Sequence, residues 1–261
     1  MKISTWNVNS INARIEHLQK LISSDQSDIY LLQELKTIED GFPKEAIKKV
    51  GYYSYINGQK AWNGVAILSK KKLNITNNSI PNYDDPNARF IETEIQLEKI
   101  KQRIKLINIY LPNGNPIDTE KFDYKIQWMK MFNIYIKNLK DNNVPIIIAG
   151  DFNVIPTDDD VYSPENYKND ACAHPLTREQ FRILENMGFT DLVKYFVDGK
   201  TNWTFWGYRG GGWQKGNGLR IDHFLVTSNI VDLVTKVEVN REPRSWEKAS
   251  DHTPVTINLK N

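Results

Sequence analysis

The order of strand-like and helix-like segments is the feature that most restricts the fold of this chain. Runs in which apolar residues alternate or are continuous predict strands, and runs in which they recur every three to four residues predict helices. The chain begins strand–helix–strand–helix, continues through consecutive strands, and then returns to helices followed by strands. This mixed order predicts α/β layers with mostly antiparallel or mixed sheets and disfavours a doubly wound parallel sheet. The predicted strands are residues 2–8, 28–34, 52–56, 64–69, 89–97, 104–110, 144–149, 220–227, 233–239 and 253–259, and the predicted helices are residues 11–23, 43–50, 118–141 and 177–187.

One domain spanning residues 1–261 is expected, since neither an internal repeat nor a Gly/Ser- or Pro-rich linker divides the chain. Hydrophobic residues make up 40% and charged residues 25%, which excludes collagen-like and low-complexity classes. Cys172 is the single cysteine and cannot form an internal disulfide, which is compatible with a reducing compartment. The longest apolar run, residues 144–149, is too short to cross a bilayer, and residues 1–8 lack the pattern of a secretory signal. We therefore expect a cytoplasmic protein that does not bind membranes.

The charge of the chain is unevenly distributed. The net charge of +2 is too small to indicate a polyanionic partner. Within residues 194–220, however, one acidic residue, Asp198, stands against the basic residues Lys194, Lys200, Arg209, Lys215 and Arg220, and seven aromatic residues lie between them. A local positive field attracts a polyanion without a high isoelectric point. Composition alone leaves two readings of this segment open, a nucleic-acid contact and a solvated basic loop.

Polar side chains recur where predicted strands begin or end. One such residue is ordinarily a cap or a turn residue. Repetition at six strands predicts instead that the strand ends meet at one sheet edge and direct these groups into one cleft. The residues concerned are Asn7, Asn9, Glu34, Tyr110, Asn113, Asp151, Asn153, Asp222, His223, Asp251 and His252.

The chemistry of this set indicates a hard divalent cation. Carboxylate and amide oxygens favour Mg²⁺ or Mn²⁺, whereas a Cys cluster or an HExxH motif, both absent from this sequence, would indicate zinc. A histidine beside two aspartates suits proton transfer or the stabilisation of an anionic phosphate. Together these groups predict metal-assisted hydrolysis of a phosphate ester.

Short motifs in a fixed order now carry a family resemblance. The chain resembles the exonuclease III family of DNA-repair nucleases and apurinic/apyrimidinic (AP) endonucleases, which belongs to the endonuclease/exonuclease/phosphatase superfamily. Each motif alone is weak, but their order over nearly the whole chain is specific. The motifs are residues 5–11 (TWNVNSI), 28–34 (DIYLLQE), 58–66 (GQKAWNGVA), 108–113 (NIYLPN), 150–154 (GDFNV), 218–222 (GLRID) and 250–254 (SDHTP).

The resemblance implies a metal site at the end of the second strand. Glu34 would ligate the principal cation with Asn7 beside it, and Asp251 would lie near the metal or at a second site. The sequence departs from the family at Leu35, where a threonine commonly follows the ligand. Because neighbouring side chains of an extended segment point to opposite sides, we expect Leu35 to alter packing and not ligation.

The resemblance also implies catalytic roles. Asp151 would position or deprotonate the attacking water, and Asn153 would hydrogen-bond the scissile phosphate or that water. Asp222 would orient His252, which would contact the phosphate. Tyr110 would hydrogen-bond the phosphate or stabilise the leaving group.

DNA contacts are implied in the aromatic segment. Phe205, Trp206 and Leu219 would surround a pocket that receives an abasic sugar, which leaves a duplex cheaply because it neither stacks nor pairs. Arg209 and Lys215 would contact backbone phosphates, and residues 210–218, which include Lys215, are expected to be flexible and exposed. The groove would be lined further by Asn113, Arg89 and Lys60. For Asn9 we expect a turn contact, and for His17, His174 and His223 surface or packing positions.

The resemblance implies a four-layer α/β sandwich with two central mixed sheets packed face to face and helices outside. The expected activity is divalent-metal-dependent cleavage of double-stranded DNA, by incision 5′ to abasic sites and by 3′→5′ removal of nucleotides, in a monomer. The main alternative is a phosphatase or phosphodiesterase of the same superfamily that acts on inositol phosphates or lipid headgroups. A secreted DNase and a non-catalytic DNA-binding module are less well supported, since signal and disulfides are missing and Glu34, Asp151 and His252 are all present.

Overall fold

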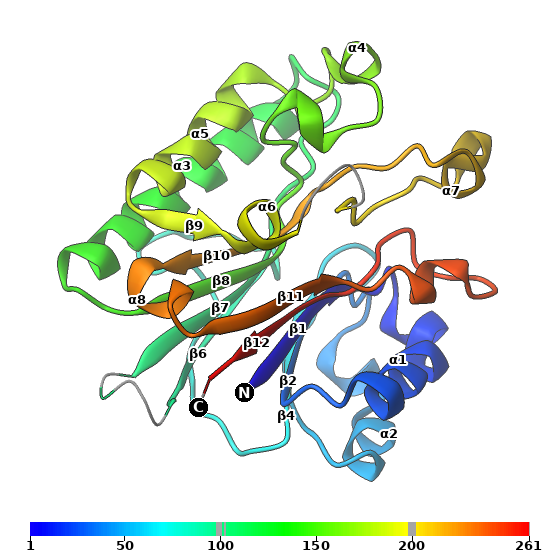
Figure 1. Cartoon of the computed structure of the whole chain (residues 1–261), viewed down its shortest axis with the longest axis vertical. Helices are drawn as coiled ribbons and strands as arrows, with labels where there is room; N and C mark the ends of the chain where they lie inside the picture. Colours follow the sequence, from blue (N-terminus) through cyan, green and yellow to red (C-terminus); the bar gives the residue numbers. More distant parts are fainter. Residues whose placement is uncertain (98–100, 102, 198–201, 261) are drawn as a thin grey trace.

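Two mixed six-stranded sheets packed face to face form the centre of the protein, in a computed structural model that describes residues 1–97, 101, 103–197 and 202–260 (Figure 1). The first sheet has the order β11 (Val234–Val239), β12 (Val255–Leu259), β1 (Lys2–Asn7), β2 (Ile29–Gln33), β4 (Val65–Ser69), β3 (Tyr53–Asn57). The second has the order β5 (Ile75–Asn77), β6 (Phe90–Ile95), β7 (Ile104–Tyr110), β8 (Ile146–Asp151), β10 (Asp222–Thr227), β9 (Phe189–Asp191).

Helices cover the outer face of each sheet, which gives four layers (Figure 1). Helices α1 (Ile11–Asp25) and α2 (Lys44–Lys49) pack on the first sheet, and α3 (Glu120–Asp141) and α5 (Pro175–Asn186) pack on the second. The central strands are therefore buried on both faces, which explains why β8 reads as a continuous apolar run. The short helices α4 (Pro164–Tyr167), α6 (Leu192–Phe196), α7 (Gly212–Lys215) and α8 (Ser228–Val231) lie in the connections.

Each sheet contains one parallel pair of strands. Strands β1 and β2 are parallel and are joined through α1, and β7 and β8 are parallel and are joined through α3. The other pairings are antiparallel. A parallel pair brings the carboxyl ends of its strands to the same edge, so Asn7, Gln33, Tyr110 and Asp151 end their strands together.

A buried amide pair connects the two sheets just below this edge. The Gln33 Nε2 group donates to Asn108 Oδ1 at 2.7 Å. Asn108 Nδ2 donates in turn to the carbonyl oxygens of Leu32 and Ala66, at 3.0 and 2.9 Å. Both side chains are fully buried. Buried polar groups are tolerated when they find partners, and here the partners lie in the opposite sheet, so the bonds restrict how the sheets slide past each other.

The predicted fold and the predicted mixed sheets are confirmed. Each predicted strand and helix is present, with ends shifted by a few residues. Strands β5 and β9 and helix α6 were not predicted, because three to five residues are too few to show a period. No helix among the described residues has the length and apolar character needed to cross a bilayer.

Arg220 corrects one part of the sequence interpretation. It was grouped with a basic, DNA-facing segment, but only 1% of it is exposed. Its Nε donates to Asp160 Oδ1 at 2.8 Å, and its Nη1 pairs with Asp191 and lies 2.8 Å from His223 Nδ1. Its charge is therefore neutralised internally. Of the remaining charges in that segment, Asp198 and Lys200 lie outside the described residues.

The Arg220 cluster makes a prediction about stability. Burial alone would raise the pKa of Asp191, but Arg220 and His223 outweigh burial and hold this pKa well below its usual value. Asp191→Asn should lower the free energy of unfolding at pH 7 by about 3–5 kcal/mol, because Arg220 loses a buried partner. A lowered folded-state pKa gives stability that is complete above the ordinary aspartate value of about 3.9 and is lost progressively as the pH falls from there towards the lowered folded-state pKa. The difference from wild type should therefore be smaller at pH 3 than at pH 7.

Urea denaturation at both pH values measures this effect. Asp141→Asn is the matched control, since Asp141 pairs with Lys137 on the surface and such pairs contribute at most about 1 kcal/mol. An Asp191→Asn variant as stable as the control at pH 7 would show that the cluster does not stabilise the fold.

Candidate active site

A cleft of about 750 Å³ opens at the edge where β1, β2, β7 and β8 end. Both sheets contribute to its walls, so it spans the seam between them. Residues predicted from the sequence that line the cleft are Glu34, Arg89, Tyr110, Asn113, Asp151, Asn153, Phe205, Leu219, Asp251 and His252. Lys60 is exposed and does not line it.

Four residues around the cleft have left-handed backbone conformations. The φ angles of Asn9, Glu34, Lys36 and Asn153 are 46°, 52°, 55° and 48°. Non-glycine residues rarely adopt this region, and it is concentrated at functional sites where the surroundings enforce it. The chain thus turns sharply directly after strands β1, β2 and β8, which places these side chains at the sheet edge.

Asn7 joins the two carboxylates at the centre of the site. Its Nδ2 group donates to Glu34 Oε1 at 3.0 Å and to Asp151 Oδ2 at 2.9 Å. Its Oδ1 accepts the backbone N–H of Asn9 at 3.0 Å. The predicted position of Asn7 beside Glu34 is therefore found, but its oxygen is engaged elsewhere. Asn7 orients the two carboxylates, and a direct ligand role would require that its amide turn.

Glu34 is held as a charged group. The Tyr110 hydroxyl donates to its Oε1 at 2.8 Å, and Lys36 Nζ lies 2.9 Å from its Oε2. Burial would raise the pKa of Glu34, but Lys36 and Asn7 outweigh burial and lower it. Burial raises the pKa of Tyr110 well above its usual value, and the Glu34 carboxylate adds to this effect, so Tyr110 stays a hydrogen-bond donor. Lys36 lies two positions after the end of the predicted strand 28–34, but nothing in the sequence assigned it a role.

His252 and Asp222 form a buried pair opposite Glu34. His252 Nδ1 lies 2.8 Å from Asp222 Oδ2, which also accepts the Thr204 hydroxyl at 2.6 Å. Burial alone would lower the pKa of His252, but Asp222 and Asp151 outweigh burial and raise it to about 10. The imidazole is therefore protonated at neutral pH. No sequence signal pointed to Thr204, which reaches Asp222 only through the fold.

Asp151 lies between these two groups. Its Oδ2 lies 3.6 Å from His252 Nε2, and its Oδ1 accepts the backbone N–H of Asn153 at 2.9 Å. Burial raises its pKa to about 7; His252 opposes this rise, whereas Asp222 and Glu34 add to it. An aspartate with a pKa near neutrality can both accept and return a proton, which is the property of a general base.

The donor atoms of Glu34, Asp151 and His252 all lie within 4.8 Å of one another, a spacing that could hold a metal ion. His252 is a weak ligand here, because its Nδ1 is committed to Asp222 and the ring is protonated. The carboxylate oxygens of Glu34 and Asp151 are the fitting donors, and hard oxygens suit a hard cation. Asp251 lies outside this group; its Oδ1 accepts Asn9 Nδ2 at 2.9 Å, so Asn9 links Asp251 to the site as well as forming a turn.

Two asparagines form the wall next to Asp151. Asn113 Nδ2 donates to Asn153 Oδ1 at 3.1 Å, and Asn153 Nδ2 donates to the Leu111 carbonyl at 2.9 Å. Asn113 is exposed to the cleft, whereas Asn153 is buried. The pair therefore joins the loops after β7 and β8 and presents amide groups to whatever enters the cleft.

Phe205 and Leu219 form an apolar wall on the opposite side. They pair as an isolated bridge, and the Phe205 ring lies 4.9 Å from the His252 ring in an edge-to-face arrangement. Trp206 was predicted to share this wall, but that prediction is wrong. Its side chain is fully buried, does not line the cleft and packs edge-to-face on Trp213 at 4.9 Å.

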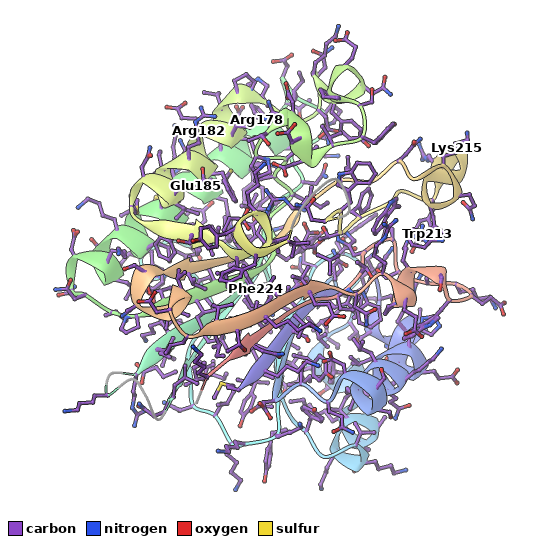
Figure 2. All side chains as sticks on the ribbon, viewed as in Figure 1. Arg178, Arg182, Glu185, Trp213, Lys215 and Phe224 are labelled. Atoms are coloured by element: carbon purple, nitrogen blue, oxygen red, sulfur yellow. The ribbon has the colours of Figure 1, made fainter. Side chains whose placement is uncertain are left out.

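Two arginines from a distant segment contact the aromatic residues of the loop of residues 207–218. The Arg241 guanidinium lies 4.9 Å from the Trp206 ring and 5.3 Å from the Trp213 ring, and that of Arg244 lies 5.5 Å from Trp213. Figure 2 shows Trp213 and Lys215 on α7 at the end of a projecting loop. Arg209 and Lys215 are exposed, line no part of the cleft, and form no ion pair within the described part of the chain.

The remaining predictions concern residues outside the site. Leu35 is buried in the core between α1 and the first sheet, as expected for a packing change. His223 is buried beside Arg220, His17 packs against Trp246, and His174 caps α5. None of these histidines contacts the cleft.

Comparisons with known proteins establish the family of the chain. Residues 4–252 match the model of the endonuclease/exonuclease/phosphatase family, and the chain belongs to this family. It is 31% identical to the exodeoxyribonuclease III of Haemophilus influenzae over 271 residues, covering 100% of both chains. The 3′ phosphatase NExo from Neisseria, solved with a product DNA hairpin, has a TM-score of 0.93 at 35% identity. An AP endonuclease from Archaeoglobus fulgidus has a TM-score of 0.92 at 31% identity. Both structures are matched over 100% of each chain.

The carboxylate geometry predicts that Glu34 dominates cation affinity. Glu34→Gln keeps the shape and removes one charge, so affinity for Mg²⁺ or Mn²⁺ should fall by at least about 10²-fold, since even residues behind metal ligands contribute about 10- to 100-fold. Isothermal titration calorimetry measures this. Glu39→Gln, at an exposed glutamate paired with Lys44, should bind as wild type does. Equal affinities for both variants would place the cation elsewhere.

The His252–Asp222 pair predicts a measurable titration. In the metal-free protein, NMR should show His252 losing its proton only as the pH rises towards about 10. Asp222→Asn removes the adjacent negative charge and should move this titration down by at least one pH unit. The exposed Asp232→Asn substitution is the control. A His252 titration that is identical in all three proteins would contradict the assigned role of Asp222.

Proposed function

We propose that this protein is a divalent-metal-dependent DNA-repair nuclease that incises duplex DNA 5′ to abasic sites and removes nucleotides from 3′ ends. The observation that carries the proposal is the placement of Asp151 between the Glu34 carboxylate and the protonated His252–Asp222 pair in one cleft. This arrangement offers a base for water and a cationic donor for a phosphate oxygen within one small volume.

We propose Mg²⁺ or Mn²⁺ as the cofactor, held by Glu34 with Asp151 close by; Asp251, beside the cleft, could serve a second position. When bound, such a cation supplies electrostatic stabilisation of the negative charge that grows on the phosphate oxygens. Lys36 Nζ pairs with Glu34 Oε2, and a bound cation would have to displace part of that contact.

The chain's own groups supply the rest of the proposed reaction. Asp151 accepts a proton from the attacking water, for which a pKa of about 7 is well matched. His252 donates a hydrogen bond from Nε2 to a phosphate oxygen, while Asp222 keeps its Nδ1 proton in place. Asn153, supported by Asn113, positions the phosphate or the water. Tyr110, which stays protonated and donates to Glu34, hydrogen-bonds the phosphate or stabilises the leaving group in this proposal.

The walls of the cleft support a DNA substrate. Phe205 and Leu219 give an apolar surface beside the proposed catalytic groups, large enough for an extruded sugar without its base. Arg209 and Lys215 project from the anchored loop next to it, and exposed cations without protein partners suit backbone phosphates, which position DNA without reading its sequence.

The relatives support the same class of substrate. They include an exodeoxyribonuclease III, an AP endonuclease and a 3′ phosphatase bound to DNA, each matched over its whole length. Action on inositol phosphates or lipid headgroups, the superfamily alternative, has no such support among them. We further propose that the chain acts as a monomer in the cytoplasm; a lone, buried cysteine is compatible with that compartment.

The proposal predicts a strong preference for abasic DNA. With Mg²⁺, incision of an abasic duplex should exceed internal cutting of the intact duplex by at least about 10²-fold, because a normal nucleotide must be unstacked and unpaired. EDTA should abolish both. Phe205→Ala should erode this preference more than it weakens duplex binding.

A gel assay with abasic, intact, recessed 3′-hydroxyl and 3′-phosphate duplexes measures this preference. Tyr195→Ala, at an aromatic residue exposed away from the cleft, is the control. Similar internal cutting of abasic and intact duplexes would refute the abasic-site proposal. Release of phosphate from an inositol phosphate, with no DNA cut, would support the alternative.

A further inference from the structure

Helix α3 buries a lysine directly behind the proposed catalytic loops. Lys125 is 0% exposed, on the helix face that otherwise presents Phe122, Trp128 and Met129 to the core. It forms no ion pair with a carboxylate of the described residues. Burial lowers the pKa of Lys125, whereas Cys172, Asp170 and Asp151 nearby oppose this and favour the charged form. An ammonium removed from water without an anionic partner is costly, so a packing role alone would favour a methionine or leucine here.

The Lys125 ammonium binds the backbone of both asparagine loops. Its Nζ donates to the Asn153 carbonyl at 2.6 Å and to the Asn113 carbonyl at 3.0 Å. The chain also closes around its stem. A Cβ added to Gly114, whose φ is 84°, would lie 2.5 Å from Lys125 Cδ and 3.3 Å from Ala171 Cβ. One side chain thus holds together the loops after β7 and β8.

Two hydrogen bonds continue from these loops to the centre of the site. Asn113 Nδ2 donates to Asn153 Oδ1, and the Asn153 backbone N–H donates to Asp151 Oδ1 at 2.9 Å. A single residue, Asn153, therefore separates the buried cation from the proposed general base. Because the dielectric constant is low in the buried region around Lys125, the positive charge of its ammonium attracts any anion that enters the cleft beside Asp151.

We propose that Lys125 is a positioning residue for phosphodiester hydrolysis. It fixes Asn113 and Asn153 at the phosphate-binding wall and places an internal positive charge behind that wall that favours the negative charge of the transition state. This inference rests on the proposed function for the location of the phosphate, but it applies to any phosphodiester bound beside Asp151. It identifies a residue that never touches the substrate.

Lys125→Met tests the proposal, since methionine fits an apolar site and lacks the ammonium. The exposed Lys130→Met on the same helix is the matched control. We expect kcat of Lys125→Met to fall by about 10- to 100-fold with KM changed by less than about 3-fold, as for lost transition-state stabilisation. The loss should be equal on abasic duplex and on bis-para-nitrophenyl phosphate, which is too small to reach Lys215.

Salt dependence separates this role from a surface contact. The logarithmic salt slope of duplex binding should be unchanged in Lys125→Met, whereas Lys215→Met should make it shallower by about one unit. Lys125→Arg, which restores charge and donors, should recover part of kcat, and Lys125→Gln, a donor without charge, should recover less. If circular dichroism shows that Lys125→Met does not fold, the kcat values of Lys125→Arg and Lys125→Gln are compared instead to test the role of the charge.

Three outcomes would overturn the inference: wild-type kcat in Lys125→Met, a loss confined to KM, or equal activity of the Arg and Gln variants. A wild type that cleaves bis-para-nitrophenyl phosphate but no DNA would refute the proposed function instead and leave the Lys125 test intact.

Discussion

The contact between the two sheets is the constraint on which the rest of the structure depends. The proposed catalytic groups come from both sheets: Asn7 ends β1 and Glu34 follows β2 in one, and Tyr110 and Asp151 end strands of the other. Their spacing is therefore set by how the sheets are placed, and a displacement of 1 Å would separate Asn7 from Asp151. Apolar packing provides most of the attraction but tolerates sliding; the hydrogen bonds of Asn108 to Leu32 and Ala66 across the seam remove that freedom.

The site itself is a concentration of buried negative charge that the fold has to accommodate before any cation or phosphate arrives. Glu34, Asp151 and Asp222 would repel one another in isolation. Asn7 donates hydrogen bonds to both Glu34 and Asp151. His252 lies between Asp151 and Asp222, and Lys36 neutralises Glu34. The left-handed conformations of Glu34 and Asn153 add local strain. The packing of the sheets has to offset both the charge repulsion and the backbone strain. This explains why these groups lie at the strand ends and not on the outer loops.

Long periodic segments predicted an α/β fold, and the recurrence of polar residues at strand ends predicted the edge that holds the site and most of its members. The four layers were implied by the family resemblance. The predictions that were wrong concerned residues whose position depends on partners far away in the sequence. Arg220 appeared to belong to a basic surface, because Asp160 and Asp191 are brought to it only by folding. Phe205 and Trp206 are adjacent in an aromatic run, yet one lines the cleft and the other is buried. Lys125 interrupts an apolar stripe, and nothing local distinguishes it from a lysine at a helix surface.

The anchoring of the glycine-rich loop has a consequence for the way the protein meets a large, stiff ligand. The guanidinium groups of Arg241 and Arg244 lie 5.3 and 5.5 Å from the Trp213 ring, and these contacts reduce the conformational entropy that the loop would lose on binding. If Arg209 and Lys215 contact a duplex as proposed, the preformed loop would meet it with little rearrangement, and electrostatic steering would favour the encounter.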